Sequence, residues 1–290
     1  MKALWDVPAP AKLNLFLHII GRRADGYHLL QSLFVLIDWQ DTLHLECRAD
    51  GRLTRHDTGH ALPEDDLCLR AARLRPPARG STLGADITIE KRLPSGAGMG
   101  GGSSDAATVL LALNRLWGLN WSRQKLLQLG ERLGADVPFF IGGHNAFVEG
   151  IGEQLTPVDL APQWFAVVKP PVDIPTKTIF QSPLLVRDTE PVILAGLPAD
   201  TASVTGRNDL QPAAEAQAPA VRDVAQWLEE RFGNSRMTGS GSAVFARAGA
   251  IRDGTGDQPV ATWREGELPP GWVGRMCRSL TQHPLAGWAD

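Results

Sequence analysis

A glycine-rich run in front of an apolar helix limits most strongly how this chain can fold. Five of the seven residues in Gly96–Gly102 are glycine, and ordering a glycine loses more backbone entropy than ordering any other residue. Two serines then lead into residues 106–117, which are apolar almost all round and predict a buried helix ending at Gly118. Main-chain N–H groups without covering side chains, next to a helix N-terminus, form a ready site for phosphate oxygens. The sequence therefore predicts an anion-binding loop rather than a plain surface turn.

Period-two alternation of apolar residues predicts strands on both sides of this loop. The first strand is expected to start at Lys12, which shares its polar face with Asn14. Further strand segments are expected over residues 33–37, 43–47, 87–89, 164–168 and 243–246. An opening so rich in strands favours an antiparallel sheet.

Capping residues and helical spacing predict three further helices. They cover residues 67–74 after Asp65 or Asp66, residues up to 133 after Ser122, and residues 221–232 before Gly233. Glycines and prolines between Gly150 and Pro162 predict a boundary, and 290 residues are many for one domain. We therefore expect two domains, residues 1–155 with the glycine-rich loop and residues 156–290. Residues 247–266 give no clear pattern.

The balance of charges disfavours several classes of partner. The chain has 29 basic and 32 acidic residues, so its net charge of −3 provides no field for nucleic acid or an anionic membrane. The first ten residues hold no apolar run that resembles a signal peptide or a spanning helix, which favours the cytoplasm. Cys47, Cys68 and Cys277 lack Cys-x-x-Cys spacing, so we expect three reduced, buried thiols.

Spacing separates the phosphate-binding loops that such a run can form. A P-loop is excluded because Gly102 is followed by Ser103 without the required lysine. The dinucleotide pattern Gly-x-Gly-x-x-Gly is met from Gly96 onward, but residues 120–122 lack the acid that contacts a ribose. This pattern alone leaves open a second interpretation, a nicotinamide-dependent oxidoreductase.

Residues 94–107 are similar to the phosphate-binding motif of the GHMP kinase superfamily. Four other segments carry the same resemblance: residues 10–17, 23–28, 134–139 and 238–241. It implies an α+β fold with two domains, the first like domain 2 of ribosomal protein S5 and the second ferredoxin-like. It also implies an enzyme that uses ATP and Mg²⁺ to phosphorylate an alcohol on a small molecule carrying cytidine diphosphate. The nearest alternative is a GHMP-type kinase for another alcohol.

The resemblance assigns ATP to the loop and names no metal-ligating side chain. The nucleotide-binding residues it implies are Pro94, Ser95, Gly96, Ala97, Gly98, Met99, Gly100, Gly101, Gly102, Ser103 and Ser104. The two serines can cap the helix or contact Mg²⁺ and phosphate. Lys91 either reaches a phosphate or, as the favoured interpretation, is a solvated strand-end lysine. Asp66 stands where many relatives carry Asn, at the border of the adenine pocket.

Two residues carry the expected chemistry. By resemblance, Asp136 accepts or orients the proton of the acceptor hydroxyl, and Lys12 is its partner, lowering the hydroxyl's pKa. Taken from the sequence alone, Asp136 is equally well a turn residue and Lys12 a solvated lysine. Asn14, on the same strand face as Lys12, is expected to hydrogen-bond the substrate.

An aromatic pair is expected to hold the nucleobase. By resemblance, Tyr27, the only tyrosine in the chain, and Phe180 sandwich cytosine, with His28 bonding its edge. Thr176 is assigned to the same substrate side. Without the resemblance, Tyr27 and Phe180 are ordinary packing residues and His28 a turn histidine. The loop 238–242 either closes over the substrate phosphates or forms a plain tight turn.

Overall fold

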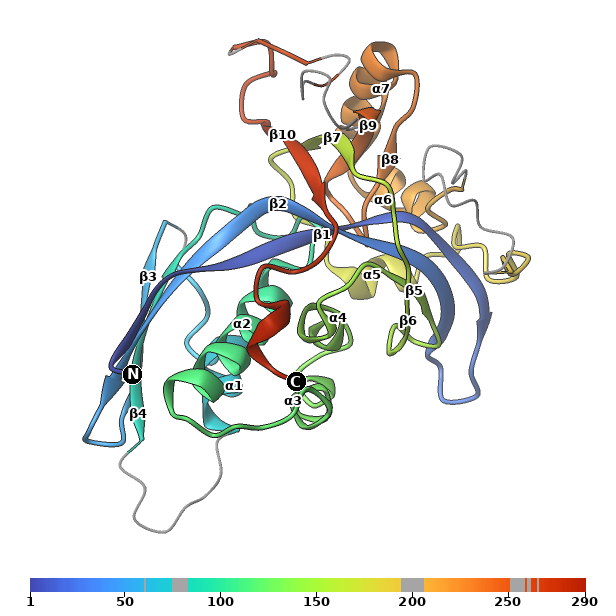
Figure 1. Cartoon of the computed structure of the whole chain (residues 1–290). Coiled ribbons are helices and arrows are strands. Elements are labelled where there is room, and N and C mark those ends of the chain that lie inside the picture. Colours follow the sequence, from blue (N-terminus) through green and yellow to red (C-terminus); the bar gives the residue numbers. More distant parts are fainter. Residues whose placement is uncertain (60, 75–82, 194–205, 251–258, 260–261, 265) are drawn as a thin grey trace.

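The computed structural model describes residues 1–59, 61–74, 83–193, 206–250, 259, 262–264 and 266–290, and the fold is α+β as expected (Figure 1). Within these residues ten strands form one sheet, ordered β3-β4-β2-β10-β7-β9-β8, with β1 and β5 also paired to β2 and β6 paired to β5. The strands are β1 (Ala3–Arg22), β2 (His28–Arg48), β3 (Leu53–Thr58), β4 (Gly84–Glu90), β5 (Ala146–Glu149), β6 (Gln154–Pro157), β7 (Gln163–Lys169), β8 (Arg236–Met237), β9 (Val244–Ala250) and β10 (Val273–Leu280).

Helices cover the sheet at both ends. They are α1 (Leu67–Arg73), α2 (Gly101–Leu116), α3 (Arg123–Glu131), α4 (Val137–Gly142), α5 (Thr176–Phe180), α6 (Gln211–Gln217) and α7 (Pro219–Phe232), with a 3₁₀ turn η3 (Ala286–Trp288). The predicted caps are confirmed, since Asp66 accepts bonds from the first turn of α1 and Ser122 from that of α3. Gly233 closes α7 in the left-handed conformation. No helix among the described residues has the length and apolar character needed to cross a membrane.

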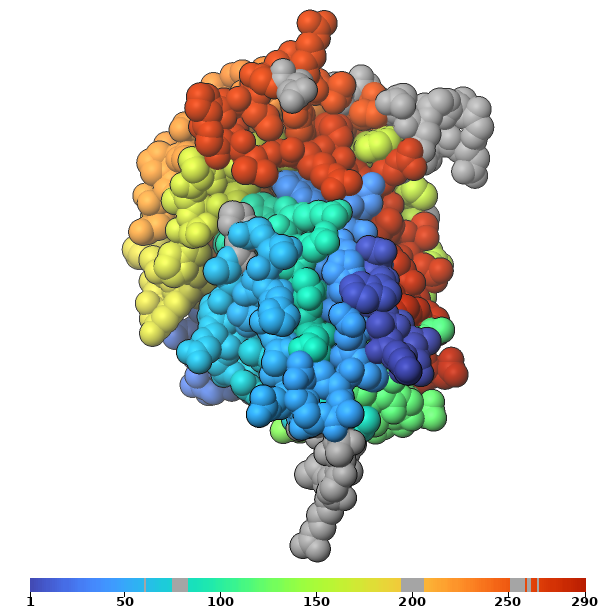
Figure 2. Space-filling model, turned by 90° about the vertical axis from the view of Figure 1, so that its left-hand side faces the viewer, coloured from blue at the N-terminus to red at the C-terminus, as the bar shows by residue number. Residues whose placement is uncertain are grey.

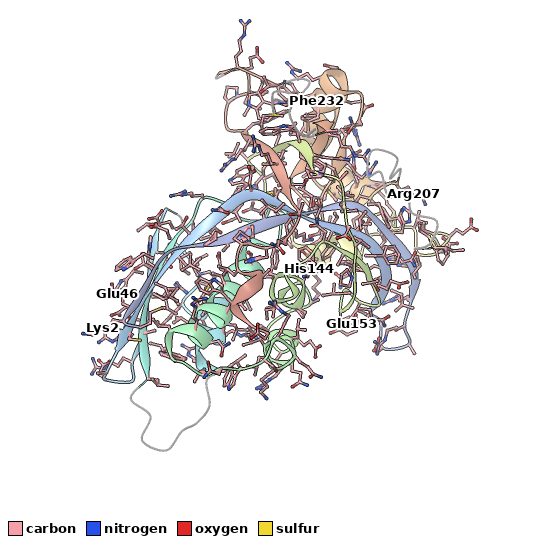
Figure 3. The ribbon with its side chains drawn as sticks, viewed as in Figure 1. Lys2, Glu46, His144, Glu153, Arg207 and Phe232 are labelled. Carbon is pink, nitrogen blue, oxygen red and sulfur yellow. The ribbon has the colours of Figure 1, made fainter. Side chains whose placement is uncertain are left out.

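The strands β1 and β2 form a long antiparallel ribbon that spans the molecule (Figure 1). Figure 3 labels Lys2 and Glu46 at one end of the molecule and Arg207 and Glu153 toward the other. The prediction that the first strand starts at Lys12 is wrong, because β1 begins at Ala3 and runs through two prolines. Among the described strands β1 pairs only with β2, and an edge strand tolerates residues without an N–H group. Lys12 thus lies in the middle of a strand, where it can be buried.

Three apolar clusters hold these layers together. One lies between the sheet and α1–α4, and a second lies between β7–β9 and α5–α7. The third joins the two halves of the chain, since it unites Leu13 and Val35 with Phe165 and Phe245. Ala97 and Met99 of the glycine-rich loop belong to this third cluster. The loop is therefore anchored where the two halves meet.

The end of the chain returns to the first half. Leu285 and Ala289 belong to the cluster around α2, and the N–H group of Arg123 donates to the carbonyl of Asp290 at 2.7 Å. In Figure 2 most of the orange and red atoms lie above the blue and cyan atoms of the first half, and further red atoms lie beside the blue ones on the right. The boundary at residue 155 stays a prediction.

Several local predictions differ from the structure. Residues 33–37 and 43–47 are parts of one strand, β2, and the expected boundary region contains β6, which forms a hairpin with β5. Cys68 and Cys277 are buried as expected, but Cys47 is exposed, so that prediction is wrong. Cys47 lies near the end of β2, where Glu46 is exposed as well and Arg48 is half-buried. Part of the unassigned stretch 247–266 continues β9, and residues 251–258, 260–261 and 265 lie outside the described residues.

Candidate active site

The glycine-rich loop alternates buried anchors with positions that only glycine fills easily. Ala97 and Met99 are 4% and 2% exposed. Gly96, Gly98 and Gly100 between and around them have φ angles of +59°, +72° and +72°, a region in which side chains are strained. The loop therefore turns its main chain toward one side while its two side chains hold it in the core.

A second loop, residues 238–243, packs against the first. The N–H groups of Ser242 and Ala243 donate to the carbonyls of Gly96 and Ala97 at 2.9 and 3.2 Å. A Cβ atom on Gly98 would lie 2.3 Å from the carbonyl oxygen of Thr238. The two loops thus touch through their main chains, and the second half of the chain fixes the shape of the first loop.

We expect a Gly98→Ala substitution to lower the free energy of unfolding by about 3 kcal/mol or more and to weaken ATP binding. The added methyl group would both strain a positive φ and collide with the second loop. Gly233→Ala is the matched control, because Gly233 has a φ of +66° but nothing within 4 Å of its Cβ position. Urea unfolding measures the difference, and equal losses in the two variants would refute the close packing of the loops.

The helix α2 begins inside the predicted loop, at Gly101, earlier than residue 106. Its N-cap is Gly100 in the left-handed conformation, and no side chain caps it. The first-turn N–H groups are thus left for another acceptor, at the positive end of the helix dipole. The Ser104 hydroxyl does not cap these N–H groups. It is buried and donates to the carbonyl of Pro10 at 2.7 Å. Ser103 lines the cavities described next.

Two cavities share this loop. The loop cavity, about 320 Å³, lies against α2 and is closed on one side by Leu62, Leu67 and Leu93. The central cavity, about 440 Å³, contains Lys12, Asn14 and other predicted residues. Gly96, Gly98, Gly100 and Ser103 line both cavities. The two cavities therefore adjoin along the glycine-rich loop.

Lys12, Asn14 and Asp136 meet in the central cavity. The Lys12 ammonium donates to Asn14 Oδ1 at 2.6 Å, and its Nζ lies 3.5 Å from Asp136 Oδ2. Asp136 is the N-cap residue of α4, yet its side chain makes no capping hydrogen bond. Its carboxylate is 31% exposed, so it faces the cavity solvent. The alternative of Asp136 as an ordinary helix-terminus residue gains no support from this geometry.

Lys12 is a buried cation. Its side chain is 4% exposed, and its Nζ lies 4.2 Å from the centroid of the Phe34 ring. Burial lowers the pKa of Lys12, while attraction to Asp136 opposes that change. A solvated lysine, the alternative from sequence, is excluded. Asn14 orients Lys12 and is itself held by Ser32, whose hydroxyl accepts from Asn14 Nδ2 at 2.9 Å.

A third cavity, the rim cavity of about 650 Å³, adjoins the central one. Tyr27, His28 and Phe180 line it, and Phe180 also lines the central cavity, as does Thr176. The His28 and Phe180 rings lie 5.1 Å apart at 32°. Tyr27 is 61% exposed, which favours a contact surface over a packing role. The structure therefore brings the predicted base-binding residues together beside the predicted catalytic pair.

The prediction that Lys91 is solvated is wrong. Its side chain is 5% exposed, and its ammonium is bonded to Asp41 and, at 2.7 Å, to Asp105. Burial by itself would lower the pKa of Lys91, but the two carboxylates outweigh it and the pKa is raised. Asp41 also accepts from the N–H groups of Arg92 and Leu93 at 2.6 and 2.8 Å. This cluster fixes the chain where it enters the glycine-rich loop. The signal for it in the sequence was Asp105, a carboxylate in the otherwise apolar helix α2.

Burial raises the pKa of Asp105 to about 7, against the influence of Lys91 and with that of Asp41. Between its ordinary pKa of 3.8 and about 7, the folded chain keeps a proton that the unfolded chain has released. The contribution of Asp105 to the free energy of unfolding therefore falls as the pH rises from 3.8 to about 7. We expect Asp105→Asn to remove that fall, as measured by urea unfolding at pH 4 to 7. The exposed Asp223→Asn is the control, and an identical pH dependence in both variants would assign the proton elsewhere.

Asp66 does not line the loop cavity itself but holds the segment that does. Besides capping α1, its Oδ1 accepts from Arg55 Nη1 at 2.6 Å. Arg55 also donates to the carbonyls of Leu62 and Pro63 at 3.2 and 2.9 Å. The aspartate thus positions the segment that presents Leu62 and Leu67 to the cavity. A change from Asn to Asp at this position keeps the cap and adds an ion pair.

The donor set fits a metal ion that arrives with phosphates. No group of three or more His, Cys, Asp or Glu side chains among the described residues is arranged to hold a metal. Asp136 and Ser103, which both carry side-chain oxygens, line the central cavity. Mg²⁺ commonly takes one or two protein oxygens together with substrate phosphates and water. The residues are therefore suited to Mg²⁺ bound with a nucleotide.

Comparisons with known proteins identify the family of this chain. Family models of the GHMP kinases N terminal domain and the GHMP kinases C terminal match residues 66–144 and 195–253. The 4-diphosphocytidyl-2-C-methyl-D-erythritol kinase of Methylibium petroleiphilum is 63% identical over 290 residues, which covers 100% of this chain and 99% of that protein. The protein of the same name from Variovorax paradoxus is 52% identical, with 100% of both chains covered.

Solved structures give the same result. The crystal structure of a 4-(cytidine 5'-diphospho)-2C-methyl-D-erythritol kinase is 36% identical with a TM-score of 0.71, covering 84% of this chain and 90% of that chain. A homoserine kinase from Cytophaga hutchinsonii, 20% identical with a TM-score of 0.61 over 86% of each chain, shares the fold. Since its relatives match it at high identity over their full length, the chain belongs to the 4-diphosphocytidyl-2-C-methyl-D-erythritol kinase family of the GHMP kinases.

Proposed function

We propose that this chain transfers the γ-phosphoryl group of ATP to the 2-hydroxyl of 4-diphosphocytidyl-2-C-methyl-D-erythritol, in the non-mevalonate route to isoprenoid precursors. Family membership makes it an ATP-dependent small-molecule kinase. One observation carries the proposal: Lys12 and Asp136 lie 3.5 Å apart in a cavity that joins the glycine-rich loop on one side and the rim cavity on the other.

The loop cavity suits the nucleotide. The uncapped N-terminus of α2 and the bare main chain from Gly96 to Gly100 supply N–H groups for phosphate oxygens. The apolar wall of Leu62, Leu67 and Leu93 suits an adenine ring. Mg²⁺, when bound with the nucleotide, neutralises charge on its phosphates. The triphosphate would then end at Ser103, on the boundary with the central cavity.

The chemistry requires positioning and charge stabilisation more than reactive groups. The acceptor oxygen attacks the γ-phosphorus, the bond to the oxygen of the leaving ADP breaks, and the hydroxyl proton passes to Asp136. Lys12 stabilises the negative charge that develops on the acceptor oxygen. Asn14 holds the Lys12 ammonium in place through its 2.6 Å bond.

The rim cavity supports a cytidine substrate over other alcohols of this superfamily. Neither homoserine nor mevalonate contains a base that Tyr27 and Phe180 can stack on. The oxidoreductase alternative loses support, because the strand before the loop, β4, is parallel only to β3 and antiparallel to β2. A dinucleotide fold requires a mainly parallel sheet at this turn. We place the enzyme in the cytoplasm, where its nucleotide substrates are found.

Release of ADP, coupled to a spectroscopic readout, tests the proposal with three acceptors. We expect turnover with 4-diphosphocytidyl-2-C-methyl-D-erythritol and no turnover with homoserine or mevalonate. Titration with NAD is expected to show no binding. Comparable rates with homoserine or mevalonate would contradict the assignment of the acceptor.

A further inference from the structure

Arg187 joins two of the residues that line the rim cavity. It follows α5 in the chain, and its Nε donates to His28 Nε2 at 3.1 Å. Its Nη2 donates to the carbonyls of Phe180 and Ser182 at 3.3 and 3.1 Å, and its Nη1 to that of Leu185 at 2.9 Å. The planar guanidinium thus fixes the His28 ring and the segment carrying Phe180 relative to each other. No sequence pattern points to this residue.

The contact also fixes where His28 carries its proton. A guanidinium only donates, so the Nε2 atom that it meets must accept and carries no hydrogen. Burial lowers the pKa of His28, and the charges of Arg187 and Arg22 lower it further. The neutral ring is therefore favoured, with its single proton on Nδ1. His28 can then act toward a ligand in the cavity as a hydrogen-bond donor.

A ring fixed as a donor distinguishes the two common pyrimidines. Cytosine has an unprotonated N3 that accepts a hydrogen bond, whereas uracil carries a hydrogen on N3 and repels a donor there. A donor facing a donor leaves both groups without a partner, which costs more than the bond itself contributes. Sites built around such a bond reject the mismatched ligand strongly.

We propose that Arg187 is a specificity-determining residue, which makes the enzyme prefer cytidine over uridine substrates by holding His28 as a donor through Nδ1. The proposal rests on the proposed function, because it concerns the base of the same acceptor. Arg187 acts through His28 and is a positioning residue. Its hydrogen bonds to the segment after α5 keep the stacking face of Phe180 in register with the ring of His28.

The test compares kcat/KM for the cytidine diphosphate acceptor and its uridine counterpart at pH 8. In Arg187→Met, we expect the cytidine-to-uridine ratio to fall about tenfold or more, mainly through KM, because both neutral tautomers of His28 become accessible. Arg187→Lys, which restores a charged donor, is expected to recover part of the ratio. Arg52→Met is the matched control: it removes an exposed arginine that lines none of the three cavities, and the ratio is expected to persist.

Lowering the pH provides a second readout, which a purely structural role of Arg187 would not change. Below its pKa, His28 carries protons on both nitrogens, so Nδ1 is a donor again whatever residue stands at position 187. In Arg187→Met the ratio is therefore expected to rise as the pH is lowered from 8 to 5.5. Besides Arg22, the charged groups that line the cavity with His28 are Asp25 and Lys177, and both stay unchanged in this comparison.

Nitrogen NMR of the His28 ring tests the proposal without turnover. We expect an unprotonated Nε2 and a protonated Nδ1 in the wild type, and a mixture in Arg187→Met. A cytidine-to-uridine ratio that stays unchanged in Arg187→Met, or a proton on Nε2 in the wild type, would overturn the proposal. Failure of the wild type to phosphorylate either nucleotide would instead refute the proposed function, while the NMR result would still decide the tautomer.

Discussion

Asp136→Asn is expected to lower kcat by about 10²- to 10⁴-fold, the range typical for loss of a positioned acid or base. The amide has the same shape as the carboxylate but accepts no proton from the acceptor hydroxyl and offers Lys12 no charge. Because Asp136 makes no capping hydrogen bond for α4, the substitution is expected to leave the fold intact. Rapid-quench measurement of a single turnover gives the effect on the chemical step.

The dissociation constant of ATP is expected to change little in this variant, since the loop and the N-terminus of α2 are unaltered. Asp159→Asn, which changes an exposed aspartate away from all three cavities, serves as the matched control and is expected to behave like the wild type. Wild-type turnover in Asp136→Asn would remove this residue from the mechanism. A loss of ATP binding as large as the loss of turnover would place it at the nucleotide instead.

Lys12→Met is expected to lower kcat by about 10²- to 10³-fold, as for removal of one preorganised group that stabilises developing charge. Methionine has a similar length and suits the apolar contact with Phe34, so the buried site stays filled. Loss of the Lys12 ammonium leaves Asn14 Oδ1 and Asp136 without their cation. Steady-state kinetics, together with thermal unfolding, separates the effect on turnover from an effect on folding.

The matched control for this variant is Lys125→Met, which removes an exposed lysine of α3. We expect wild-type kinetics from it. The double variant Lys12→Met with Asp136→Asn is expected to lose less than the product of the two single losses, because the residues act as one pair. Strictly multiplicative losses would show that the two side chains work independently despite their 3.5 Å separation.

Sequence reasoning identified the family but misjudged the surroundings of one lysine, Lys91. The motif around Gly98 and the segments that contain Lys12, Asp136 and Tyr27 were enough to identify a GHMP-type kinase. Lys91 was misjudged because its two carboxylate partners come from β2 and from α2. Strand-end lysines are usually solvated, and only packing of the helix on the sheet places Asp105 beside this one.

The sequence by itself determined the features whose causes lie within a few residues. Asp66, Ser122 and Gly233 mark helix ends because capping depends on the nearest main-chain groups. The glycine-rich run identified an anion-binding loop for the same reason, since its main chain is bare. Only the tertiary structure decided that Lys12 is buried against Asp136 and that Arg187 bonds His28. Those contacts join residues over a hundred positions apart, so they depend on strand pairing and core packing, which no local pattern records.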